Sequence, residues 1–114
     1  MPIVPRDFLD TANRLFAVGV HEADYRSSVS RAYYAAFSLV KAKTASFVSY
    51  SGAEEHLEAR RQVAWRWHDL SDDFSSLQTA RVESDYKLDR RVSRARAEHW
   101  LNVSSSLVSE LERR

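Results

Sequence analysis

The chain is organised around the segment Ser27-Ser-Val-Ser-Arg-Ala-Tyr-Tyr-Ala-Ala-Phe-Ser-Leu-Val40. It contains three alanines and neither glycine nor proline, so it favours a helix. Its apolar side chains recur at helical spacing and form one face: Val29, Tyr33, Ala36, Phe37 and Val40. A polar row keeps to one side of the same helix: Ser27, Arg31, Tyr34 and Ser38. A helix with two such faces is expected to lie centrally and to contact several neighbours.

Length and composition restrict the class of protein. A chain of 114 residues predicts a single domain, residues 1–114, with a modest core. Only two glycines and two prolines are present, which favours long helices over an all-β fold. The absence of cysteine excludes disulfides and thiolate metal sites and suits a reducing cytoplasm. Neither a secretory signal nor an apolar run of the ~20 residues that span a bilayer is visible, so we expect a cytoplasmic protein without a membrane partner.

Helical periodicity divides the chain into five segments. We predict helices over about 5–20, 22–45, 53–70 and 71–88, and a last one that begins between 89 and 93 and reaches about 112. Residues 46–52 are expected to form a loop. Because the connections are short, neighbouring helices should be antiparallel. The predicted fold is therefore all-α, a five-helix up-and-down bundle.

The last two helices carry the clearest stripes. Ser71 is expected to cap the fourth helix, with Phe74, Leu77 and Leu88 as its anchors. Arg81 falls on that stripe, and a charge on an apolar face needs a partner or a wet cavity. The last helix repeats buried positions along its length: Ala97, Trp100, Leu101, Ser104, Leu107, Val108 and Leu111.

Charge is unevenly distributed over a chain whose formal net charge is only +1. Five basic residues face one acid, Asp89, between positions 87 and 96: Lys87, Arg90, Arg91, Arg94 and Arg96. Such a run is either a solvated helix start or a local patch that binds an RNA backbone or an acidic partner. Four of the five are arginine, which suits phosphate.

Two segments resemble a known family. Arg31-Ala-Tyr-Tyr-Ala-Ala-Phe37 resembles the second helix of HEPN domains, and Ala80-Arg81-Val-Glu-Ser-Asp85-Tyr86 is similar to the end of their fourth helix. The resemblance implies a helical bundle, usually a homodimer. It also implies either a metal-independent ribonuclease, often a toxin paired with a minimal nucleotidyltransferase antitoxin, or a non-catalytic RNA-binding or scaffolding module.

Active relatives carry an arginine and, about five residues later, a histidine. The histidine acts as general base on a ribose hydroxyl, and the arginine stabilises the charged phosphate. Here Arg81 is followed at the fifth position by Tyr86, and Ser38 replaces a histidine common after the first motif. The resemblance therefore leaves both cleavage and RNA binding without cleavage open, with Arg81 and Tyr86 as catalytic candidates.

Other residues extend the candidate site. His68 lies seven residues after Arg61, on one side of the predicted third helix, where Trp65 and Trp67 are placed to stack on bases. We take His68 as a third catalytic candidate; the alternative is a packed, hydrogen-bonded histidine. Two further pairs, Arg94 with His99 and Arg14 with His21, are weaker candidates.

A polar pocket is expected if the second and fourth helices are neighbours. Its members would be Arg31, Tyr34, Arg81, Asp85 and Tyr86. They form either a structural ion-pair network or a phosphate site. The predicted RNA- or phosphate-binding residues are Arg31, Tyr34, Arg61, Arg90, Arg91 and Arg94.

No cofactor or metal is predicted. The cluster Glu54, Glu55, His56 and Glu58 does not converge on one side of a helix, and the glycine content excludes phosphate-binding loops. Two functions remain. The first is a HEPN-domain protein of a prokaryotic toxin–antitoxin or defence system that binds or cleaves RNA. The second is a non-catalytic dimeric adaptor whose tryptophans and arginine run bind a nucleotidyltransferase or another protein.

Overall fold

The computed structural model describes residues 3–45, 47 and 52–114. It contains the helices α1 (Pro5–Val18), α2 (Glu22–Lys43), α3 (Ala53–Arg66), α4 (Ser71–Tyr86) and α5 (Arg94–Arg113), and a 3-10 helix, η1 (His68–Leu70). Among these residues there is no strand, and the predicted all-α, five-helix bundle is confirmed. The predicted loop over 46–52 falls mostly outside the described residues. No helix in the described part of the chain is long and apolar enough to cross a membrane.

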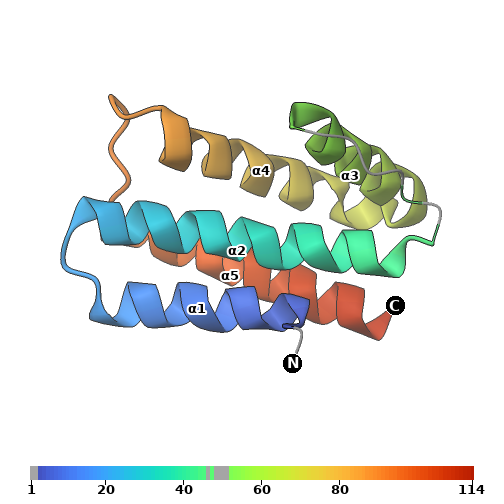
Figure 1. Cartoon of the computed structure of the whole chain (residues 1–114), viewed down its shortest axis with the longest axis horizontal. Helices are drawn as coiled ribbons and strands as arrows, with labels where there is room; N and C mark the ends of the chain where they lie inside the picture. Colours follow the sequence, from blue (N-terminus) through green and yellow to red (C-terminus); the bar gives the residue numbers. More distant parts are fainter. Residues whose placement is uncertain (1–2, 46, 48–51) are drawn as a thin grey trace.

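The central helix is α2, as the sequence predicts. It packs against α1, α3, α4 and α5, and α1 and α4 lie on opposite sides of it (Figure 1). Its five predicted apolar residues are all buried: Val29, Tyr33, Ala36, Phe37 and Val40. The long helices α1, α2, α4 and α5 alternate in direction along the chain (Figure 1). Of the polar row of α2, Ser27 and Arg31 are exposed, whereas Tyr34 and Ser38 are half-buried.

The turn from α1 to α2 is tight because of Gly19. The predicted helix to residue 20 ends at Val18, and Gly19 is extended and buried. A Cβ atom on Gly19 would lie 2.6 Å from the carbonyl oxygen of Leu15 and 2.8 Å from the Cβ of Asp24. The hydroxyl of Tyr25 donates to the Gly19 carbonyl at 3.2 Å. Gly19 thus permits a close approach between α1 and α2. It does not mark a frayed helix end.

The predicted third helix over 53–70 is broken at Trp67. Its backbone leaves the helical region (φ −135°, ψ 60°), so α3 ends at Arg66 and η1 follows. Leu70 is buried in the core, and Trp67 packs against the same core. The break therefore turns the chain so that the side chains of Trp67 and Leu70 both reach the core. Helical periodicity does not reveal this, because it depends on tertiary packing.

Two expectations for α4 are wrong. Ser71 is the first residue of the helix rather than its cap, because Leu70 enters from the 3-10 turn. Leu88 is 77% exposed because α4 ends at Tyr86, and the stripe of Phe74 and Leu77, both fully buried, stops before it.

The last helix, α5, follows its predicted pattern. Ser93 caps it, since the Ser93 side chain accepts from the Arg96 N–H at 3.2 Å. Its stripe is buried except for the half-buried Trp100. The buried hydroxyl of Ser104 donates to the Ala32 carbonyl at 2.7 Å, so its polar atom is satisfied and α5 is fixed against α2.

Candidate functional site

Arg81 lies at the seam between α4 and α2, where its side chain is only 12% exposed. Its Nη2 donates to the hydroxyl of Tyr34 at 2.8 Å, and its Nε lies 2.9 Å from Oδ2 of Asp85. The guanidinium also lies over the rings of Tyr34 and Tyr86, at 5.2 and 5.5 Å from their centroids. The seam thus brings together four of the five residues of the predicted polar pocket, and Asp85 and the rings balance the charge of Arg81.

Arg31 does not join this group. Its side chain is exposed, and within the described residues no hydrogen bond or ion pair links it to Arg81 or Asp85. The nearby Ser30 takes the expected place, since its hydroxyl donates to Asp85 Oδ2 at 3.1 Å. On a helix, adjacent residues point about 100° apart, so a one-residue difference decides which side chain enters the seam.

His56 completes the group from α3, an arrangement that the sequence did not reveal. Its Nδ1 lies 2.7 Å from the hydroxyl of Tyr33, and its ring centroid is 4.6 Å from that of Phe37. Burial and the charge of Arg81 lower the pKa of His56, which keeps the imidazole neutral near pH 7. Burial raises the pKa of the Tyr33 hydroxyl well above its ordinary value. We call Tyr33, Tyr34, His56, Arg81 and Asp85 the Arg81 cluster.

A signal for His56 was present in the sequence. It precedes the buried residues Ala59 and Val63 by three and seven positions, which places it on the core side of α3. Only the packing of α3 against α2 and α4, however, brings that side next to Arg81.

Arg61 and His68, which were predicted to lie on one side of the third helix, do not belong to the same helix. Arg61 is exposed and lies 3.9 Å from Glu58, whereas the exposed His68 begins η1. Because α3 breaks at Trp67, the seven-residue spacing no longer keeps both side chains on one side. Among the described residues, neither is joined to Arg81 by a hydrogen bond, so their functional roles stay predictions.

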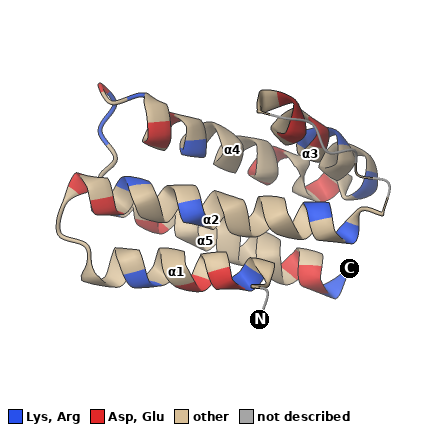
Figure 2. Ribbon diagram, viewed as in Figure 1, with Lys and Arg blue, Asp and Glu red and all other residues tan. Residues whose placement is uncertain are grey.

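The basic run forms a second surface, where α4, the loop 87–93 and α5 meet. Figure 2 shows Lys and Arg on both arms of this loop. A hollow of about 460 Å³ opens there, and its wall includes Arg90, Arg91, Arg96 and His99. Arg90 lies 3.3 Å from Glu83, which balances its charge. The side chains of Arg91 and Arg96 are exposed and form no ion pair within the described part of the chain. We call Arg90, Arg91, Arg96 and His99 the basic junction.

Arg94 points elsewhere. Its guanidinium lies 4.2 Å from the ring centroid of Phe16 and donates to the Phe16 carbonyl at 3.3 Å. Arg96 is two residues further, about 200° around α5, and so lines the hollow instead. The structure therefore places Arg90 and Arg91, but not Arg94, at the hollow. It adds Arg96, which belongs to the basic run but is not among the predicted binding residues.

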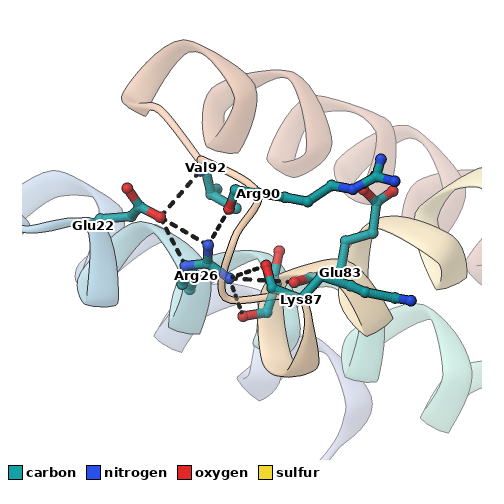
Figure 3. Close-up of polar contacts among 7 residues, drawn as sticks. Glu22, Arg26, Glu83, Lys87, Arg90 and Val92 are labelled. Atoms are coloured by element: carbon teal, nitrogen blue, oxygen red, sulfur yellow. Dashed lines mark hydrogen bonds and ion pairs between the residues drawn. The ribbon is translucent and has the colours of Figure 1, made fainter.

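The loop 87–93, which carries Arg90 and Arg91, is held in place by Arg26 of α2 (Figure 3). Its Nη1 donates to three main-chain carbonyls, those of Glu83 at 3.2 Å, Ser84 at 2.9 Å and Lys87 at 3.4 Å. Its Nη2 donates to the carbonyl of Arg90. The last carbonyls of a helix lack partners within it. Arg26 binds two of them at the end of α4, those of Glu83 and Ser84, and the Glu83 carbonyl also accepts from the Lys87 N–H at 3.0 Å.

Glu22 completes this arrangement from the first turn of α2. Its carboxylate accepts from Nε of Arg26 at 2.9 Å and from the Val92 N–H at 3.3 Å (Figure 3). Both interactions lower the pKa of Glu22. Glu22 and Arg26 together form a clamp that fixes both ends of the loop. The sequence shows only a Glu–Arg pair four residues apart, which is common on solvated helices.

No group of three or more histidine and acidic side chains is placed to hold a metal ion in the described part of the chain. The HEPN domain family model matches residues 6–114. No curated protein and no solved structure matches the chain. The match covers nearly the whole chain and agrees with the helical bundle and with the two motifs on α2 and α4, and the chain therefore belongs to the HEPN domain family.

Proposed function

We propose that this HEPN domain binds RNA through the basic junction, within a prokaryotic toxin–antitoxin or defence system. The observation that supports this most directly is the hollow bordered by Arg91 and Arg96, two exposed guanidinium groups that form no ion pair among the described residues. The charge of Arg91 acts on the carboxylate of Glu22, which is itself paired with Arg26. Guanidinium groups bind phosphate oxygens in a bidentate manner. Because the net charge is only +1, attraction for a polyanion would come from this local surface rather than from the whole protein.

Binding is better supported than cleavage. The charge of Arg81 is already balanced by Asp85, and the hydroxyl of Tyr34 accepts from it. A guanidinium that is paired in this way has fewer free N–H groups and less uncompensated charge to offer a phosphate. Cleavage by Arg81, Tyr86 and His68 is the alternative, and it predicts that expressing the chain alone is toxic and degrades RNA. Harmless expression with intact RNA, matched by an Arg81→Ala variant, would rule it out.

The binding test is fluorescence anisotropy with a labelled single-stranded RNA over a range of salt concentrations. Affinity should fall as salt rises, and the double variant Arg91→Ala, Arg96→Ala should reduce the slope by about 1 for each phosphate that the variant no longer neutralises. The matched control is Arg113→Ala, because Arg113 lies at the other end of α5 and pairs with Glu110. Salt-independent or absent binding by the unaltered chain would contradict the proposal.

A second candidate function is a non-catalytic dimeric adaptor that binds a nucleotidyltransferase. Trp65 favours it, since this side chain is 74% exposed at a shallow hollow shared with Trp67 and Lys43. Exposed tryptophans are typical anchors of protein interfaces. Co-purification with a minimal nucleotidyltransferase, weakened by Trp65→Ala and unchanged by Arg91→Ala, would support this function.

A further inference from the structure

The hollow at the basic junction differs from a flat basic patch, because its lining also contains apolar and aromatic side chains. Ala80 and Val92, both buried, line its inner part together with the half-buried Trp100. The exposed ring of His99 lies 4.6 Å from the ring of Trp100, with their planes 69° apart. The hollow therefore offers apolar and aromatic surface inside and positive charge at its edge.

We propose that this hollow takes one unpaired nucleobase while Arg91 and Arg96 hold the phosphates on either side of it, so that the protein binds single-stranded rather than duplex RNA. The inference rests on the proposed function and names its substrate class. The volume of the hollow, about 460 Å³, falls in the usual range of small-ligand pockets, roughly 300–1,000 Å³. In a duplex the faces of the bases are covered by their neighbours, whereas an unpaired base is free to stack on an aromatic ring.

Glu83 explains why a base, and not a phosphate, would occupy the interior. Its carboxylate lines the hollow and lies 3.3 Å from the guanidinium of Arg90. This negative charge repels a phosphate and offsets the one arginine that is already paired. It accepts hydrogen bonds well, however, and so suits the amino group of a base. The phosphates would instead bind to Arg91 and Arg96 at the rim.

The hollow is also formed before any ligand binds. Val92 and Arg91 sit on the loop that Glu22 and Arg26 hold at both ends. Little ordering of the protein is then needed on binding, and a preformed site loses less conformational entropy than a flexible one. A flexible basic loop, by contrast, would follow the backbone of any nucleic acid.

The test compares three labelled probes at one salt concentration: a single-stranded RNA, a blunt RNA duplex, and an abasic ribose-phosphate oligomer with the same number of phosphates as the single strand. We expect the single strand to bind about 5- to 160-fold more tightly than the abasic oligomer, which is the range that stacking of one base provides. The duplex should bind like the abasic oligomer. This comparison alters only the ligand, so it does not depend on the folding of a variant.

The protein side is tested with His99→Ala, because His99 is exposed. This change should reduce the preference for the single strand over the abasic oligomer, and Asn102→Ala, at an exposed position of α5 outside the hollow, should leave it unchanged. The double variant Arg91→Ala, Arg96→Ala should instead weaken all three probes. Equal, salt-dependent binding of the three probes would overturn the inference and leave the proposed function standing. Absence of binding to every probe would overturn both.

Discussion

Nη1 of Arg26, in the second turn of α2, donates to the main-chain carbonyl of Ser84, near the end of α4, at 2.9 Å. This bond, with the neighbouring ones to Glu83, Lys87 and Arg90, joins the central helix to the end of α4 and to the loop that bears Arg90 and Arg91. The arginine at this position therefore acts on main-chain atoms, and its effect on the surface above it is indirect.

Replacing Arg26 should destabilise the fold and distort the basic junction. Arg26→Ala removes the donor to the carbonyls of Ser84 and Arg90, whereas those of Glu83 and Lys87 still accept from the N–H groups of Lys87 and Arg90. We expect a loss of about 2–4 kcal/mol in the free energy of unfolding. Arg26→Lys should recover only part of it, because an ammonium group cannot reach all four acceptors. Urea unfolding measures the change. Arg14→Ala, at an exposed position of α1, is the control; equal effects of the two alanine variants would contradict the role of the clamp.

The ion pair of Arg81 and Asp85 should show strong coupling. Arg81→Met leaves the carboxylate of Asp85 without its cation, and we expect a cost of about 2–4 kcal/mol. Asp85→Asn alone should also destabilise, because it leaves Arg81 without a balancing charge. The double variant should cost less than the sum of the two, by about 1–3 kcal/mol. A double-mutant cycle by urea unfolding checks this, and additive effects would show that the pair is not coupled.

The lowered pKa of His56 makes stability depend on pH. Burial and Arg81 disfavour the charged imidazole in the folded state, against a weaker opposing effect of Glu55. The unfolded chain therefore binds a proton more readily, and stability is lost as pH falls below the ordinary histidine pKa of about 6.5. His56→Gln keeps a polar partner for the Tyr33 hydroxyl but does not titrate.

The measurement is urea unfolding of the unaltered chain and of His56→Gln between about pH 5 and pH 8. The variant should lose less stability than the unaltered chain across the lower half of this range. The pKa values of carboxylates such as Glu22 and Asp69 are lowered by their arginine partners. Their protonation reduces the stability of both proteins alike, at more acidic pH. Identical pH profiles would show that His56 is not the titrating group.

Gly19→Ala should be more harmful than an ordinary loop substitution. The added Cβ would lie 2.6 Å from the Leu15 carbonyl oxygen and 2.8 Å from the Asp24 Cβ, so the α1–α2 turn would have to open. We expect a loss of about 1–3 kcal/mol. Gly52→Ala serves for comparison: there the Cβ meets nothing within 4 Å, although φ is +65° and carries a strain of roughly 1 kcal/mol. Thermal or urea unfolding of the two variants should rank Gly19→Ala as the less stable.

The sequence predicted the features that depend on local periodicity. The buried face of α2, the stripe of α5 and the position of Arg81 on the apolar face of α4 all follow from spacing along a helix, which tertiary packing does not alter. The pairing of Arg81 with Asp85 was accessible for the same reason, since the two residues are four apart on one helix. These features, with the two motifs, were enough to identify the family.

The tertiary structure decided what depends on how the helices are rotated and where they stop. The break at Trp67 separated His68 from Arg61, and the end of α4 at Tyr86 exposed Leu88. The packing of α3 brought His56 to the Arg81 cluster. Arg26 was hidden most completely, because its partners are main-chain carbonyls, which every residue has and no sequence pattern marks. The spacing of side chains can be read from the sequence. The contact of a side chain with a distant main-chain group is determined only when the helices pack together.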